Sequence, residues 1–198
     1  TYTILGHTNG EEAVVCLQNQ GVNIRYNNEL RFETTSDGAT VTGDLTLTSS
    51  DAGSTDGPIV NLTRDSSSPA VNDILGSVRF LGKNDADQDV TYAEIDSIIF
   101  DETDGTENGA LRINAINDGS STTYLTFGDG RARFAQDARF DDNVNAYFGT
   151  GNDLRIYHSG SNSFIQEGGT GDLYIQSATV NITDLSLIHI SEPTRPSS

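Results

Sequence analysis

The chain repeats a short pattern in which two apolar residues flank one more polar residue, and Gly, Asn, Asp, Ser and Thr fill the spaces between. In an extended strand, the outer two side chains of such a triad point to one face and the middle one to the other. The spacer residues favour turns. The pattern therefore predicts an all-β chain of short strands with a thin core. The triads are VNI 22–24, LRF 30–32, LTL 45–47, ARF 132–134, ARF 138–140, AYF 146–148, LRI 154–156, LYI 173–175 and VNI 180–182.

The length of the apolar runs divides the chain into regions. Residues 1–50 form an N-terminal triad region, and residues 51–57 form a Ser-, Gly- and Asp-rich linker. Residues 58–130 carry longer runs that predict an antiparallel β-meander, although YAEIDSIIF also fits a helical turn. The runs are PIVNLTR, LGSVRFLG, DVTYAEIDSIIF, GALRINAI and TTYLTFG.

Residues 131–184 return to triads and contain a direct repeat. GTGNDLRI at 149–156 recurs as GTGDLYI at 169–175, and such self-similarity is typical of stacked structure. We therefore predict an elongated, repetitive β structure in which triad regions, resembling a β-prism, flank the central meander.

Composition limits how much core one chain can build. Only 34% of the residues are hydrophobic, against about 45–50% in globular domains. Burying one apolar side chain contributes about 1.5–3 kcal/mol, whereas ordering the backbone costs about 1–2 kcal/mol per residue. Cys16 is the only cysteine, so no intrachain disulfide adds stability, and we expect Cys16 to be a small buried residue. Other copies of the chain must then supply the missing contacts, and we predict an obligate oligomer.

The charge excludes some classes of partner. The chain has 29 acidic and 11 basic residues, for a net charge of −18, and Lys83 is the only lysine. Nucleic acids and anionic membranes would be repelled, because binding to them depends on Lys and Arg. No segment reaches the roughly 20 apolar residues of a membrane span, so we expect no membrane insertion. We interpret the acidity as a source of solubility for a long exposed surface.

The two ends of the chain break its pattern. The chain starts at Thr1 without a methionine, so we expect it to be a fragment. The run LSLIHISEPTR at 185–195 resembles, at every position, the translation of a transposon-type DNA sequencing adapter. We therefore exclude residues 185–198 from the interpretation as a non-native tail.

Three stretches resemble the tail-fibre and fibre-like virion proteins of environmental and marine phages. They are ELRFETTSDGATVTGDL, the run from VNLTRDSSSPAVND to GALRI, and YFGTGNDLRIYHSGSNSFIQEGGTGDLYIQS. The resemblance implies a virion location, an elongated and intertwined homotrimeric β shaft, and a receptor-binding tip that the shaft carries. Its implied partners are two further copies of the chain and other phage tail proteins.

One acidic cluster has the spacing of a calcium loop. Asp85, Asp87 and Asp89 alternate as the first three ligands of such a loop do. However, the sixth position is Val90 instead of Gly, and the twelfth is Asp96 instead of Glu. A solvated hairpin tip explains the cluster better, and we assign no cofactor.

A single histidine offers a second metal hypothesis. His158 follows the triad at 154–156 and shares the face of its outer residues. Three copies around a three-fold axis would bring three imidazoles together, and imidazole binds transition metals well. The paired His-x-His that such fibres use is absent, so a strand-end histidine is the simpler interpretation.

Tyrosines offer the better functional hypothesis. Tyr147, Tyr157 and Tyr174 occupy or follow the middle positions of triads, where they would stack against sugars of a host-surface glycan. Ordinary cross-strand packing is the alternative. No nucleophile elbow, phosphate loop or Ser–His–Asp spacing is present, and we predict no enzyme. The leading hypothesis is a fibre shaft, followed by glycan binding by this segment itself and by a bacterial surface adhesin.

Overall fold

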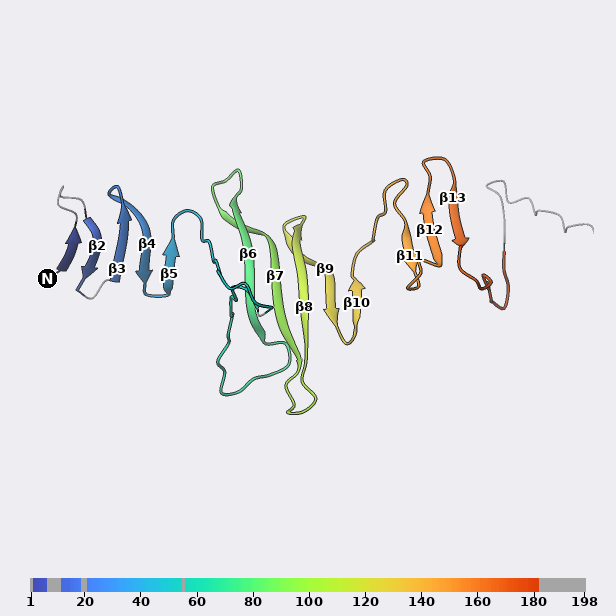
Figure 1. The fold of residues 1–198 in the computed structure, drawn as a ribbon, viewed down its shortest axis with the longest axis horizontal. Coiled ribbons are helices and arrows are strands. Elements are labelled where there is room, and N and C mark those ends of the chain that lie inside the picture. The colour runs from blue at the N-terminus through green and yellow to red at the C-terminus, as the bar shows by residue number, and fades with distance from the viewer. Residues whose placement is uncertain (1, 7–11, 19–20, 55, 182–198) are drawn as a thin grey trace, which may run out of the picture. The chain divides into compact units, whose positions relative to one another are not determined.

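The computed structural model describes residues 2–6, 12–18, 21–54 and 56–181, and these contain strands, turns and loops with no helix. The strands form three separate antiparallel sheets, named here sheets A, B and C (Figure 1). The chain divides into two units, Thr1–Thr63 and Arg64–Ser198. Sheet A lies in the first unit, and sheets B and C lie in the second. The all-β, antiparallel prediction is confirmed for the described residues.

Sheet A is a five-stranded meander whose strands follow one another in chain order. Its strands are β1 (Tyr2–Gly6), β2 (Glu12–Leu17), β3 (Gly21–Tyr26), β4 (Glu29–Thr35) and β5 (Gly38–Val41). Asn27 and Asn28 join β3 to β4 and both have positive φ, at 51° and 60°. A two-residue turn with positive φ at both positions matches the right-handed twist of the flanking strands and strongly favours Asn, Asp and Gly.

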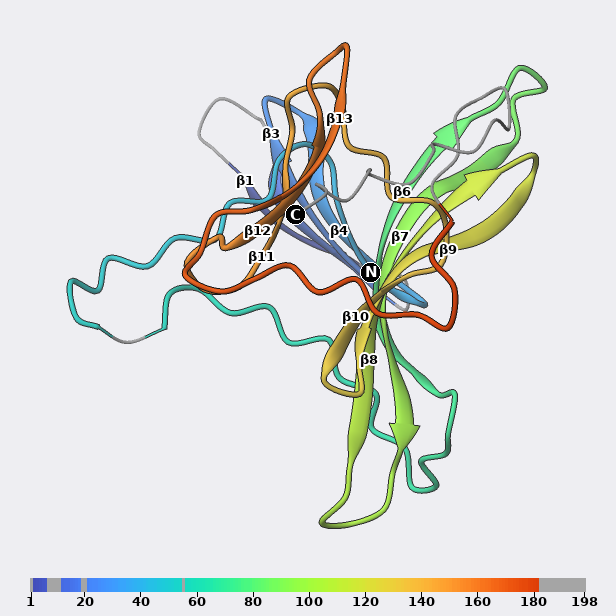
Figure 2. The ribbon, with the colours of Figure 1, turned by 90° about the vertical axis from the view of Figure 1, so that its right-hand side faces the viewer.

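Sheet B is a longer five-stranded meander. Its strands are β6 (Ile74–Lys83), β7 (Asp89–Asp101), β8 (Asn108–Asn117), β9 (Ser120–Gly128) and β10 (Arg131–Phe134). Four of its strands contain the central runs LGSVRFLG, DVTYAEIDSIIF, GALRINAI and TTYLTFG, as predicted, whereas the fifth, β10, lies in the triad region after residue 130. Asp118–Gly119 and Asp129–Gly130 close two of its hairpins, with positive φ at all four residues. YAEIDSIIF lies in β7 as strand, as its β-branched content favours. The strands fan out as in a twisted sheet (Figure 2).

Sheet C has three strands: β11 (Ala146–Phe148), β12 (Leu154–His158) and β13 (Ser163–Glu167). Gly149 to Asp153 connect β11 to β12, and the Asp153 carbonyl accepts a hydrogen bond from the Gly168 amide at 2.6 Å. This bond brings the chain back beside the β11–β12 turn after β13. The second copy of the direct repeat, at 169–175, therefore lies outside the sheet that contains the first.

Some triads do not form strands, contrary to the sequence-based expectation. LTL 45–47, ARF 138–140 and LYI 173–175 lie in segments without strands, as do the described residues of VNI 180–182 and the whole run PIVNLTR at 58–64. Their apolar side chains are exposed. A triad buries only two side chains, and without a neighbouring strand its backbone groups find no ladder partner. Short apolar triads are thus insufficient for strand formation within one chain.

The core is as thin as the composition predicts. Among the described residues, only Val15, Ile98 and Ala110 are buried apolar residues, and no large side chain is fully buried. Cys16, expected to be buried, is exposed. Successive strand residues face opposite sides, so Val15 takes the buried position and Cys16 points away from it. The predicted tail at 185–198 lies outside the described residues.

Gly21 tests the packing of sheet A. A Cβ at this position would lie 2.6 Å from the Thr34 carbonyl oxygen and 2.7 Å from its Oγ1. That hydroxyl also accepts the Val22 amide at 3.0 Å. We expect Gly21→Ala to destabilise β3 and β4 by about 1–3 kcal/mol, measured as faster amide hydrogen exchange in both strands. The control is Gly38→Ala, which also has positive φ but has no atom within 4 Å of the new Cβ. Equal effects of the two variants would contradict the prediction.

Candidate functional site

The two faces of sheet B differ sharply in chemistry. The register places Arg79 opposite Glu94, Ser77 opposite Asp96, and Arg112 opposite Asp96 from the other side. These residues alternate with apolar ones along each strand, so they share one face, named here the polar face. Thr126 and Arg133 extend it across β9 and β10.

A hydrogen-bonded network crosses the polar face. Arg112 donates two hydrogen bonds to the Asp96 carboxylate, from Nε to Oδ1 at 2.7 Å and from Nη2 to Oδ2 at 2.9 Å. Asn114 Nδ2 donates to Asp96 Oδ2 at 3.1 Å, and Thr123 Oγ1 donates to Asn114 Oδ1 at 2.7 Å. Asp96 is only 3% exposed. The hydrogen bond to Asp96 raises the pKa of Arg112. A buried carboxylate is thus fully paired across three strands.

A second ion pair lies nearer the solvent on the same face. Arg79 Nε donates to Glu94 Oε1 at 2.8 Å. The hydrogen bond from Arg79, with a further one from Ser77, lowers the pKa of Glu94. Together with the Asp96 network, this pair fixes the register of β6, β7 and β8, because a one-residue slip would move every partner to the opposite face.

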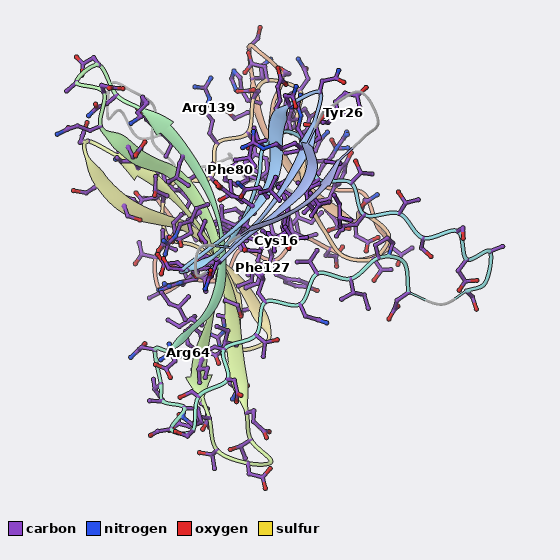
Figure 3. The ribbon with its side chains drawn as sticks, turned by 90° about the vertical axis from the view of Figure 1, so that its left-hand side faces the viewer. Cys16, Tyr26, Arg64, Phe80, Phe127 and Arg139 are labelled. Carbon is purple, nitrogen blue, oxygen red and sulfur yellow. The ribbon has the colours of Figure 1, made fainter. Side chains whose placement is uncertain are left out.

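The other face of sheet B is apolar, and several of its large side chains are exposed in the described part of the chain. It carries no charged side chain among its paired positions, and we name it the apolar face. Phe80 and Phe134 are 54% and 61% exposed, and Figure 3 labels Phe80 on β6 and Phe127 on β9. Each strand contacts only its hydrogen-bonded neighbours, so no second layer of strands from the described residues covers this face. Its apolar residues include Val78, Phe80, Ala93, Ile95, Leu111, Ile113, Leu125, Phe127, Ala132 and Phe134, and the register also places Ser97 and Thr122 on it.

This distribution departs from the usual one. Folded proteins bury apolar side chains and expose charged ones, whereas this sheet buries Asp96 together with Ile98 and Ala110 and exposes Phe80 and Phe134. A contiguous exposed apolar face is typical of an interaction surface. The sequence signal for it is the alternation of apolar and polar residues at 93–96 in β7 and at 111–114 in β8, which also predicts the strands themselves.

Sheet C brings together two of the three candidate tyrosines. Tyr147 lies opposite Arg155, and Tyr157 lies two residues beyond it on the same face. The Tyr157 ring stacks on Phe164 with centroids 4.7 Å apart. The Arg155 guanidinium lies 4.9 Å from the Tyr157 ring centroid and donates to Gln166 Oε1 at 2.8 Å. Cross-strand packing therefore accounts for Tyr157, while Tyr147 remains half exposed beside Arg155.

Tyr174 does not join this face. It lies in the strandless segment after β13 and is 83% exposed. Its hydroxyl reaches the Asp172 carboxylate at 3.4 Å. The three tyrosines therefore do not form one surface within sheet C.

The acidic cluster at 85–89 lies at the tip of the β6–β7 hairpin. Asn84 Oδ1 accepts the amides of Ala86 and Gln88 at 3.1 Å and 2.9 Å. Lys83 Nζ lies 3.9 Å from Asp87 and 3.0 Å from Asp89. These contacts form a self-contained turn in which a lysine and an asparagine side chain hold the loop, consistent with the hairpin-tip interpretation of Asp85, Asp87 and Asp89.

His158 is the last residue of β12, and its Nδ1 lies 3.0 Å from Ser163 Oγ. This cross-strand contact is consistent with a strand-end histidine. Across the described ranges, no three His, Cys, Asp or Glu side chains gather closely enough to hold a metal ion.

The Asp96 network allows a direct stability test. Arg112→Met would leave the buried Asp96 carboxylate without its cation, and breaking a buried pair in this way costs about 3–5 kcal/mol. Arg79→Met is the control, because the Arg79 side chain is 56% exposed and exposed ion pairs contribute little to stability. We expect urea unfolding at pH 7 to show a large loss for Arg112→Met only. Equal losses would mean that Asp96 does not depend on its cation.

Among the described residues, no helix has the length and apolar character to cross a membrane. The chain was also compared with known proteins. Searches against protein-family models, curated proteins and solved structures found no match.

Proposed function

We propose that this chain is a structural segment of a phage tail fibre, a shaft that positions a receptor-binding tip for attachment to the host. In this proposal three copies of the chain intertwine, and triad regions flank the meander as a prism-like, elongated structure in the virion. The role is mechanical and involves no catalysis. The observation that supports the proposal is the apolar face of sheet B, where Phe80 and Phe134 are exposed and no strand of the described residues covers them.

The chemistry of the apolar face favours copies of the same chain as its cover. Chains with a net charge of −18 repel one another, so close association requires a surface free of carboxylates. The apolar face meets this requirement, because Val78, Ile95, Leu111 and Phe127 lie on it and the charged side chains lie on the opposite face. Obligate interfaces of this apolar kind resemble a protein core cut in half.

The strandless triads support the same assembly. Leu45, Phe140 and Ile175 are exposed in the single chain, although their sequences have the pattern of half-buried strands. In an intertwined trimer, the neighbouring chains provide both the ladder partner and the apolar contact that one chain lacks. Repeated triads with stacking partners are stable even when a single unit is not.

The assembly is tested by placing a charge on the apolar face. Phe80→Asp and Phe127→Asp each bury a carboxylate in the proposed interface, which costs several kcal/mol. Multi-angle light scattering should give three times the 21.2 kDa chain mass for the wild type and the single-chain mass for both variants. Ser121→Asp adds the same charge to the polar face, opposite Ile116, and should stay trimeric. A wild-type chain that is monomeric at every concentration would overturn the proposal.

A second candidate function is glycan binding by sheet C. The observation in its favour is the shared face of Tyr147, Arg155 and Gln166, which combines an exposed ring with hydrogen-bond donors and acceptors. Aromatic rings and amide or guanidinium groups suit the apolar and hydroxylated faces of a sugar.

A glycan array of host-surface polysaccharides tests this candidate. Tyr147→Ala should weaken any array signal by about tenfold, because it removes the exposed ring without disturbing the Tyr157–Phe164 stack. Tyr26→Ala, which removes an exposed tyrosine from sheet A, should leave the signal unchanged. Silence of the wild-type chain across the array would reject glycan binding by sheet C and leave the shaft proposal standing.

A further inference from the structure

A pocket lies beside the edge strand β10 of sheet B. Its volume is about 320 Å³, at the lower end of the range of about 300–1,000 Å³ for ligand pockets. This size suits one small ligand or one terminal group of a larger one. The lining comes from β7, β9, β10 and the turn between the last two: Phe100, Thr126, Gly128, Asp129, Arg131 and Arg133.

Two arginines give this pocket its positive charge. Arg131 lies opposite Gly128 and Arg133 lies opposite Thr126, so both side chains project from the polar face, two residues apart. Arg131 Nε reaches only the Asp129 carbonyl oxygen, at 3.5 Å. Within the described part of the chain, neither arginine has a carboxylate partner.

The remaining cations of sheet B are neutralised. Arg79 pairs with Glu94, Lys83 pairs with Asp89, and Arg112 pairs with Asp96. Acidic residues outnumber basic ones by 29 to 11 in the whole chain, so carboxylates are plentiful as partners. The guanidinium groups of Arg131 and Arg133 have no such carboxylate partner among the described residues. Together they form a local anion-binding centre, because the N–H groups of a guanidinium match the two oxygens of a carboxylate.

The pocket also has an apolar wall. Gly128 has no side chain, and a Cβ there would lie 2.8 Å from the Ala110 Cβ and 3.1 Å from the Phe100 ring. The glycine therefore keeps the edge of the Phe100 ring close to the pocket without filling it. The Phe100 ring beside the cations supplies apolar contact area for a small ring.

Asp129 narrows the chemical class of the ligand. Asp129 lines the same pocket as the arginines, and an ionised carboxylate can only accept hydrogen bonds. A simple inorganic anion has no donors for this group and is repelled by it. A ligand with a carboxylate at one end and hydroxyl groups at the other satisfies both sides of the pocket.

We propose that this pocket binds a carboxylate-bearing sugar, of the uronic acid class. Arg131 and Arg133 hold the sugar carboxylate, Asp129 accepts hydrogen bonds from ring hydroxyls, and Phe100 packs against the ring. The inference rests on the proposed function in one respect. In the proposed trimer, copies of the chain cover the apolar face, so the polar face that contains this pocket stays accessible to solvent.

Ligand-observed NMR titration of the full chain tests the proposal, with D-glucuronate, D-glucose and inorganic sulfate as probes. We expect saturable binding of glucuronate and none of glucose. Arg131→Gln/Arg133→Gln should weaken glucuronate binding by about tenfold or more, because it removes the charge-assisted hydrogen bonds. The control is Arg31→Gln/Arg139→Gln, which makes the same change in net charge at two exposed arginines paired with Glu29 and Asp141 and should bind as the wild type does.

Three results would overturn the proposal: no saturable binding of glucuronate, equal weakening in the control variant, or displacement of glucuronate by equimolar sulfate. The last result would mean that the pocket recognises negative charge alone. Light scattering on the same samples distinguishes failure of the pocket proposal from failure of the trimer proposal. Glucuronate binding by a monomeric chain would reject the trimer and keep the pocket, whereas a trimer without binding would do the reverse.

Discussion

The structure of this chain depends on one constraint, the shortage of apolar surface that a single layer of strands can bury by itself. Each described sheet is one layer, and within it each strand contacts only its hydrogen-bonded neighbours. A sheet without a covering layer leaves one face, or both, in water. Sheet B shows this exposure most clearly, because Phe80 and Phe127 on its apolar face are about half exposed to solvent. The proposed trimer follows from this shortage.

The polar face of sheet B has a different role, because its hydrogen bonds specify the register in which the strands pair. Asp96 is held by Arg112 and Asn114 from the adjacent strand, and Thr123 extends the contact to the next one. A hydrophobic contact tolerates a small shift, whereas these directional bonds do not. A buried carboxylate contributes little net stability, so specificity of pairing is the better account of its presence. On the same face, Arg131 and Arg133 have no acidic partner among the described residues, which is the basis for proposing a ligand for the pocket that they line.

The central meander was predictable because its signals are local. Each long run contains enough alternating residues to define a strand, and Asp118–Gly119 and Asp129–Gly130 have the chemistry of tight hairpin turns. The triads at 45–47, 138–140 and 173–175 have the same alternation but form no strand. A strand needs a neighbour to satisfy its backbone groups, and the sequence of a triad does not say whether that neighbour lies in the same chain. The exposure of Cys16 was unpredictable for a similar reason. Alternation along a strand shows which residues share a face, but it does not show which face is buried.

The sequence by itself determined the all-β class, the positions of the turns, the alternation of polar and apolar residues along β7 and β8, and the thin core, because each depends on composition or on residues close together in the chain. Only the tertiary structure decided which side chains meet. It paired Asp96 with Arg112, stacked Tyr157 on Phe164, placed Tyr174 outside sheet C, and brought Arg131 and Arg133 beside Phe100. These contacts depend on strand register, which is set by hydrogen bonds between residues far apart in the sequence.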